Sequence, residues 1–157
     1  MTRVLKGLIF LAIAYWLWTI SPFAGNPVGK RLPPMVVEYL PPGEPYTPGV
    51  PAVIEFWATW CPPCRDSIPH LNRLKRGIAD LGIPIIGVTE EELPVVEEFR
   101  RGVSMEYTLA LDRGNRLARY FKVPSIPYAL LVDRTGKVRW AGHPSDLTAV
   151  SVREKLQ

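Results

Sequence analysis

The chain has 157 residues, enough for one domain with a short appendage, and its 47% hydrophobic and 22% charged residues fit a globular core rather than a disordered chain. The net charge of +4 comes from the N-terminal part, because four of the 19 basic residues precede the first acidic residue, Glu38. The 15 basic residues that follow balance the 15 acidic ones. A folded body without net charge lacks the basic face that binds phosphate backbones, so we exclude nucleic acid as a partner.

The N-terminal segment predicts a membrane anchor over residues 1–25. No residue from 7 to 29 is charged, and the apolar run from Leu8 to Ile20, with its apolar flanks, approaches the roughly 20 residues that cross a bilayer. Aromatic residues gather at the end of this run, and it lacks a clean small-x-small cleavage site, so we favour an uncleaved anchor over a cleaved signal peptide, the alternative. In both cases we expect export; with the anchor, the chain is a single-pass protein of the cytoplasmic membrane whose folded domain lies on the periplasmic or extracytoplasmic side.

The segment after the anchor is rich in proline, with eight prolines between residues 27 and 51. Proline lacks the amide donor that a helix needs, so this stretch predicts no long helix. We expect a proline-containing linker over residues 26–34 and a folded domain over residues 35–157, with a short first strand at residues 35–40.

The folded body alternates predicted strands and helices. The apolar runs at residues 53–57 and 83–88 are typical of strands buried on both faces. Between them, apolar residues at helical spacing predict a helix from about residue 62 to 81; its stripe is Ile68, Leu71, Leu74, Ile78 and Leu81.

The second half continues the alternation. Acidic residues 90–92 are expected at the N-terminus of the next helix, where the dipole favours them, with Pro94 in its first turn. A strand at residues 107–111, a helix at 115–121 and a hairpin of residues 128–133 and 138–141 follow, and Ser145 is expected to cap the last helix. This order predicts an α/β sandwich with a central mixed β-sheet flanked by helices.

Cys61 and Cys64 are the only cysteines, and they lie where the first buried strand meets the first helix. A disulfide at this spacing closes too small a ring to stabilise the fold much, so we interpret the pair as a redox-active disulfide. Amides at a helix N-terminus stabilise a thiolate, and the thiolate is the nucleophile of disulfide exchange. Cys61, at the exposed start of the helix, is expected to attack, and Cys64, one turn inward, to resolve the mixed disulfide.

The sequence from Phe56 to Cys64, FWATWCPPC, resembles the active-site signature of the thioredoxin superfamily, and of its membrane-tethered TlpA/ResA-like branch in particular. Pro69 matches the proline that kinks the active-site helix in that family, Ile126-Pro127 matches the cis-proline site, and Glu55 matches the buried acid. The long segment between Cys64 and Pro127 resembles the additional strand and helix of that branch. The resemblance implies a thioredoxin-like fold and thiol–disulfide oxidoreductase activity.

The remaining candidate site residues each have a structural alternative. Glu55 interrupts an apolar strand, so we expect it beneath Cys64 as a proton acceptor, although a solvent-facing or ion-paired acid is the alternative. Ile126 and Pro127 are expected to form a cis edge that pairs with an extended substrate, rather than an ordinary strand entry. Trp60 is expected at the substrate rim rather than in the core.

The expected function is thiol–disulfide exchange on extracytoplasmic protein disulfide substrates by a monomer acting as a reductant. We expect resupply by a membrane electron carrier of the CcdA/DsbD-like type, and neither a metal nor a cofactor. The alternatives are a non-catalytic thioredoxin-fold peptide-binding module and a thioreductase specific for cytochrome c maturation. Ser67 weakens the cytochrome c alternative, because family members that act in that maturation typically carry an acid at this position. A peroxidase is disfavoured because no peroxidatic-cysteine signature is present.

Overall fold

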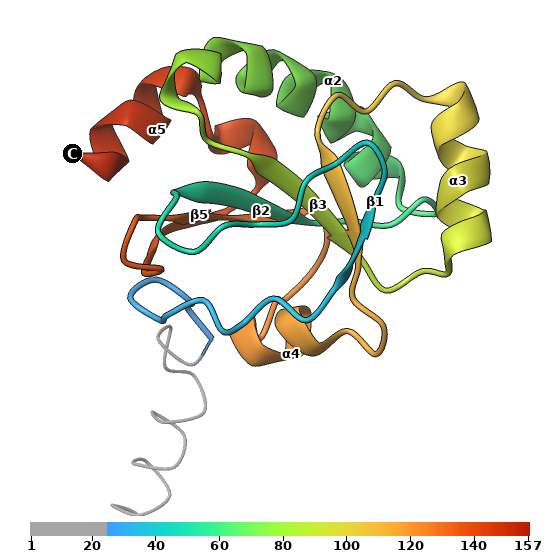
Figure 1. The fold of residues 1–157 in the computed structure, drawn as a ribbon, viewed down its shortest axis with the longest axis horizontal. Helices are drawn as coiled ribbons and strands as arrows, with labels where there is room; N and C mark the ends of the chain where they lie inside the picture. Colours follow the sequence, from blue (N-terminus) through green and yellow to red (C-terminus); the bar gives the residue numbers. More distant parts are fainter. Residues whose placement is uncertain (1–24) are drawn as a thin grey trace, which may run out of the picture.

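The computed structural model describes residues 25–157, with a mixed six-stranded sheet at the centre (Figure 1). The strand order across the sheet is β1-β4-β3-β2-β5-β6. The strands are β1 (Glu38–Leu40), β2 (Ala52–Phe56), β3 (Ile85–Thr89), β4 (Thr108–Leu111), β5 (Tyr128–Val132) and β6 (Val138–Gly142). Strands β2, β3 and β4 are parallel, whereas β1 and β5 run antiparallel to them and β6 antiparallel to β5. The structure thus confirms the thioredoxin-like α/β sandwich with a mixed sheet.

Helices cover both faces of the sheet. Helices α2 (Pro62–Gly77), α3 (Leu93–Gly102) and α5 (Ala149–Leu156) lie on one side, and α4 (Arg116–Phe121) lies on the other (Figure 1). Two short 3₁₀ turns, Ala79–Leu81 and Pro144–Asp146, follow α2 and β6. Each face has its own apolar core, one including Ile68 and Leu71 of α2 and the other Leu117 and Phe121 of α4. The central strands are buried on both sides as a result.

Several element boundaries differ from the sequence-based predictions. The first strand is shorter than residues 35–40, since it pairs with β4 only from Glu38 to Leu40. Helix α2 ends at Gly77, so Leu81 lies in the following 3₁₀ turn rather than in the helix. The prediction that Ser145 caps the last helix is wrong, because Thr148 caps α5 and Ser145 lies in the 3₁₀ turn before it.

The chain before β1 packs against the hairpin of β5 and β6. The Gly29 amide donates to the carbonyl of Val138, and the Leu32 amide donates to the carbonyl of Gly136. The anchor predicted over residues 1–25 falls almost entirely on residues 1–24, which lie outside the described part of the chain. From residue 25 onward, no helix has the length and apolar character that crossing a membrane requires.

Candidate active site

Cys61 and Cys64 form a disulfide at the start of α2. Cys61 is the N-cap residue of the helix, with extended φ and ψ of −91° and 104°, and Pro62 and Pro63 fill the first turn. Because these prolines carry no amide hydrogen, the first amide of the helix that can reach the Cys61 sulfur is that of Cys64, and its nitrogen lies 3.3 Å from Sγ. This helix start offers the sulfur one backbone donor together with the positive end of the helix dipole.

The disulfide is covered more completely than the sequence suggested. Cys61 is 3% exposed and Cys64 is fully buried, so the expectation of an exposed Cys61 is wrong for the oxidised protein. The small remaining exposure nevertheless lies on Cys61 and not on Cys64. Trp60, beside it, is 67% exposed and lies at the surface rather than in the core.

Ile126 and Pro127 lie against the outer cysteine. The carbonyl oxygen of Ile126 is 3.8 Å from the Cys61 sulfur, and the Ile126–Pro127 peptide bond is cis, as the sequence predicts. Pro127 is buried and Ile126 is half-buried. Residues 65 positions apart in the chain therefore meet at this sulfur.

Glu55 lies in the middle of β2 and is completely buried. Its neighbours in the sheet are Gly87 of β3 and Ala129 of β5, neither of which carries a polar side chain. Side chains alternate along a strand, so Glu55 faces the same side as Val53 and Trp57, which share a core with both cysteines. Burial raises the pKa of Glu55 to about 8, against the opposing effect of a hydrogen bond from Tyr107.

Tyr107, just before β4, is the partner of Glu55 that the sequence did not identify. Its hydroxyl donates to Glu55 Oε2 across 3.3 Å, whereas Glu55 Oε1 has no hydrogen-bond partner among residues 25–157. The two residues are 52 positions apart, and nothing in the local pattern of either segment signals the contact.

Glu91 is a second residue whose place was not foreseen. Helix α3 begins at Leu93 with Glu92 as its N-cap residue, so an acidic residue does lie at the helix N-terminus, although its side chain makes no capping hydrogen bond and Glu91 lies outside the helix. Instead, the Glu91 carboxylate accepts hydrogen bonds from the amide and the hydroxyl of Thr59, at 2.7 and 2.6 Å. Thr59 precedes Cys61 by two residues, so Glu91 fastens the loop that leads to the disulfide.

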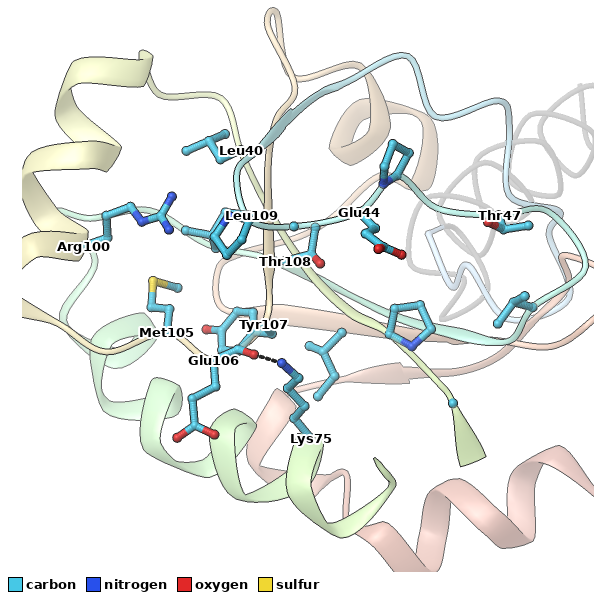
Figure 2. A pocket seen from close by; sticks show the side chains of 17 residues that line it. Leu40, Glu44, Thr47, Lys75, Arg100, Met105, Glu106, Tyr107, Thr108 and Leu109 are labelled. Carbon is cyan, nitrogen blue, oxygen red and sulfur yellow. Dashed lines mark hydrogen bonds between the residues drawn. The ribbon is translucent and has the colours of Figure 1, made fainter. Parts of the chain in front are cut away.

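A cavity of about 600 Å³ lies away from the disulfide, over the β1–β4 edge of the sheet (Figure 2). Tyr107 lines it together with charged residues of surrounding elements, among them Lys75 and Arg100. None of Trp60, Cys61, Ile126 or Pro127 lines this cavity. The disulfide is thus separate from this cavity, and with Cys61 only 3% exposed it lies at a nearly closed surface.

Comparison with known proteins agrees with this geometry. Residues 44–141, more than half of the chain, match the model of the AhpC/TSA family. The thiol-disulfide oxidoreductase ResA of Bacillus cereus is 30% identical over 86 residues, 54% of this chain and 50% of the relative. The thiol:disulfide interchange protein HelX of Rhodobacter capsulatus is 32% identical over 117 residues, 70% of this chain and 64% of the relative.

A solved structure gives a longer match. The crystal structure of a thio-disulfide isomerase from Thermus thermophilus superposes with a TM-score of 0.63 at 30% identity, covering 81% of this chain and 92% of the other. By contrast, the matched region spans only about half the length of the ResA proteins.

Proposed function

Since this chain belongs to the AhpC/TSA family and has the thioredoxin fold, we propose that it exchanges thiols and disulfides with protein substrates through Cys61 and Cys64. The observation that carries the proposal is the disulfide itself, formed at the N-terminus of α2 with the Cys61 sulfur facing the carbonyl of Ile126. A structural disulfide of this loop size would contribute little stability, whereas a helix N-terminus favours the reactive thiolate.

In the proposed reaction the dithiol form reduces a substrate disulfide. The Cys61 thiolate attacks one substrate sulfur, which forms a mixed disulfide and releases the other substrate sulfur as a thiolate. The Cys64 thiol then gives its proton to the Glu55 carboxylate and attacks the Cys61 sulfur. The Cys61–Cys64 disulfide forms, and the second substrate sulfur leaves as a thiolate. Two electrons pass from the protein dithiol to the substrate disulfide.

The surface around Cys61 supports contact with an extended chain. Ile126 presents its backbone carbonyl beside the sulfur, and an extended peptide that pairs with this backbone would place its own disulfide over Cys61. Trp60 offers an exposed aromatic face next to the same sulfur. We assign substrate contact to Trp60, Ile126 and Pro127, and proton transfer to Glu55.

The direction and place of the reaction are part of the proposal. Within residues 25–157, one amide reaches the Cys61 sulfur, so its thiolate is moderately stabilised, which favours a reductant over a strong oxidant. A reductant must be resupplied with electrons, and the N-terminal apolar segment supports an anchored protein with its domain outside the cytoplasm. A CcdA/DsbD-like membrane carrier fits this supply. Membrane fractionation and protease protection of the full chain test the location.

Cysteine variants test the activity. We expect wild type to reduce insulin disulfides with dithiothreitol as the electron source, Cys61→Ser to be inactive, and Cys64→Ser to accumulate a mixed disulfide visible on a non-reducing gel. A peptide-binding module that does not use its cysteines would bind substrate equally in all three proteins and reduce none. Faster alkylation at Cys64 than at Cys61 in the reduced protein would reverse the two roles.

A further inference from the structure

Tyr107 reaches Glu55 from another part of the chain. It lies just before β4 and is 6% exposed, and its hydroxyl donates to Glu55 Oε2. Among the described residues it is the only hydrogen-bond partner of this buried carboxyl, because Oε1 has none. A buried carboxyl with one partner has its position and its ionisation governed by that partner.

A glycine makes room for this contact. Gly87 of β3 pairs with Glu55 in the sheet. A Cβ at this position would lie 3.1 Å from Tyr107 Cε2 and 3.0 Å from Trp57 Nε1, closer than ordinary van der Waals contact. The absence of a side chain at Gly87 therefore lets both aromatic rings lie over β3, next to the strand position of Glu55.

We propose that Tyr107 is a positioning residue for thiol–disulfide exchange, which holds the Glu55 carboxyl in place, stabilises its ionised form and so sets the pH range in which Glu55 takes the proton of Cys64. The inference rests on the proposed function, in which Glu55 is the proton acceptor. Tyr107 acts through Glu55 and does not itself touch the reacting sulfur atoms.

The protonation of Tyr107 suits this role. Burial, and then the nearby Glu55, raise the pKa of Tyr107 far above its usual value, so the phenol keeps its proton and remains a donor throughout the working pH range. A donor that cannot ionise always favours the charged form of its acceptor. The hydrogen bond from Tyr107 accordingly lowers the pKa of Glu55, against the larger effect of burial.

The cations that line the cavity beside Tyr107 already have other partners. Figure 2 shows Lys75 of α2 beside Tyr107, with Nζ bonded to the backbone carbonyl of Glu106. The Glu106 carboxylate pairs with Arg76, and Arg100 of α3 donates to the carbonyl of Pro41. Glu44 also lines the cavity.

The elements directly around Glu55 bring no cation to it. Gly87 and Ala129 flank it in the sheet, and α2 presents Cys61 and Cys64 to the same core. Among the described residues, the Tyr107 hydroxyl is therefore the group through which the protein adjusts the ionisation of this carboxyl.

The test compares Tyr107→Phe with wild type. In the oxidised protein, side-chain carboxyl NMR follows the titration of Glu55, assigned by its loss in Glu55→Gln. We expect Tyr107→Phe to raise the midpoint by about one pH unit, since a hydrogen bond to a charged group has about that effect. In Tyr107→Phe, the rate at which Cys64 resolves the mixed disulfide should then increase with pH about one unit later than in wild type. Near neutral pH this rate should be up to roughly tenfold lower than in wild type.

Two controls make the result specific. Tyr39→Phe removes a hydroxyl that contacts Met35 on the other face of the sheet, and it should change neither titration nor rate. In a Glu55→Gln background, Tyr107→Phe should not shift the pH profile further. An unchanged Glu55 midpoint in folded Tyr107→Phe, or a rate loss equal at every pH, would overturn the inference. The NMR titration needs no activity, so failure of wild type to exchange disulfides would instead sink the proposed function.

Discussion

Glu91 accepts two hydrogen bonds from Thr59, one from its amide and one from its hydroxyl, and so ties the β3–α3 loop to the loop before the cysteines. The same carboxylate also accepts from the Thr89 hydroxyl at 3.2 Å. Three donors converge on one half-buried carboxylate, which fixes the backbone immediately before Cys61 and Trp60. The orientation of the sulfur and of the rim aromatic thus depends on a residue some thirty positions further along the chain.

Glu91→Gln should destabilise the protein by about 1–3 kcal/mol, because the amide nitrogen of Gln cannot accept and one donor of Thr59 loses its partner. Urea unfolding of the oxidised protein measures this change. Glu90→Gln, at an exposed neighbouring position, is the matched control and should stay within about 0.5 kcal/mol of wild type. Equal effects of the two substitutions would show that the contact with Thr59 contributes nothing to stability.

Trp60→Ala should impair exchange with proteins more than exchange with small disulfides. Its side chain is exposed, so removal should leave stability nearly unchanged but remove a large apolar surface beside Cys61. We expect kcat/KM for insulin to fall about fivefold to thirtyfold, with little change for oxidised glutathione. Val150→Ala is the control, since Val150 is as exposed but lies on α5, beside the C-terminal end of α2. A parallel loss for both substrates would assign Trp60 to positioning Cys61 instead.

The cap of α5 gives a matched pair of substitutions. The Thr148 side chain accepts from the Ser151 amide at 3.1 Å, and Ser151 bonds back to the Thr148 amide. Thr148→Ala should therefore lower the free energy of unfolding by about 1 kcal/mol. Ser145→Ala removes no side-chain hydrogen bond and should be neutral within about 0.5 kcal/mol. Chemical denaturation distinguishes these outcomes, and a larger loss at Ser145 would contradict the capping assignment.

The sequence predicted what depends on local pattern. Runs of apolar residues predicted the strands β2 and β3. The helical pattern that follows β2 predicted that Cys61 and Cys64 lie at the N-terminus of a helix, as they do in α2. Thr148 was missed because Ser145 is an equally good capping residue, and only packing decides where the helix begins.

Contacts between distant segments could not be predicted in the same way. The hydrogen bond between Glu55 and Tyr107 depends on the register of β2, β3 and β4, and on the space left by Gly87. The contact between Glu91 and Thr59 depends on how the β3–α3 loop folds back over the active-site loop. In the local sequence, Glu91 cannot be distinguished from a surface acid, and Tyr107 cannot be distinguished from an ordinary core aromatic residue.

Glu55→Gln should slow the second step of exchange while leaving the first intact. Gln has nearly the same size but cannot take the proton of Cys64, so the mixed disulfide should persist. Positioned acid–base groups contribute about a hundredfold to ten-thousandfold in rate, and a loss in this range is expected near neutral pH. Stopped-flow measurement of mixed-disulfide formation and decay separates the two steps. Decay at the wild-type rate across the pH range would leave Glu55 a structural acid only.

The burial of Glu55 also predicts how stability varies with pH. Its pKa is about 8 in the folded protein and 4.5 in the reference state, so between these values the unfolded chain has released a proton that the folded protein keeps. The free energy of unfolding should therefore fall as the pH rises through this window and level off above it. The fall attributable to Glu55 is on the order of 5 kcal/mol at most.

Glu55→Gln should abolish that fall and gain stability over wild type as the pH rises. Urea unfolding of the oxidised proteins across the window measures the difference between the two curves, with Glu97→Gln, at an exposed site on α3, as the control. Parallel curves for wild type and Glu55→Gln would mean that the carboxyl ionises as readily inside the protein as in water. In that event the hydrogen bond from Tyr107 would fully offset the effect of burial on the pKa of Glu55, because only a favourable interaction with the charged form can compensate for the loss of hydration.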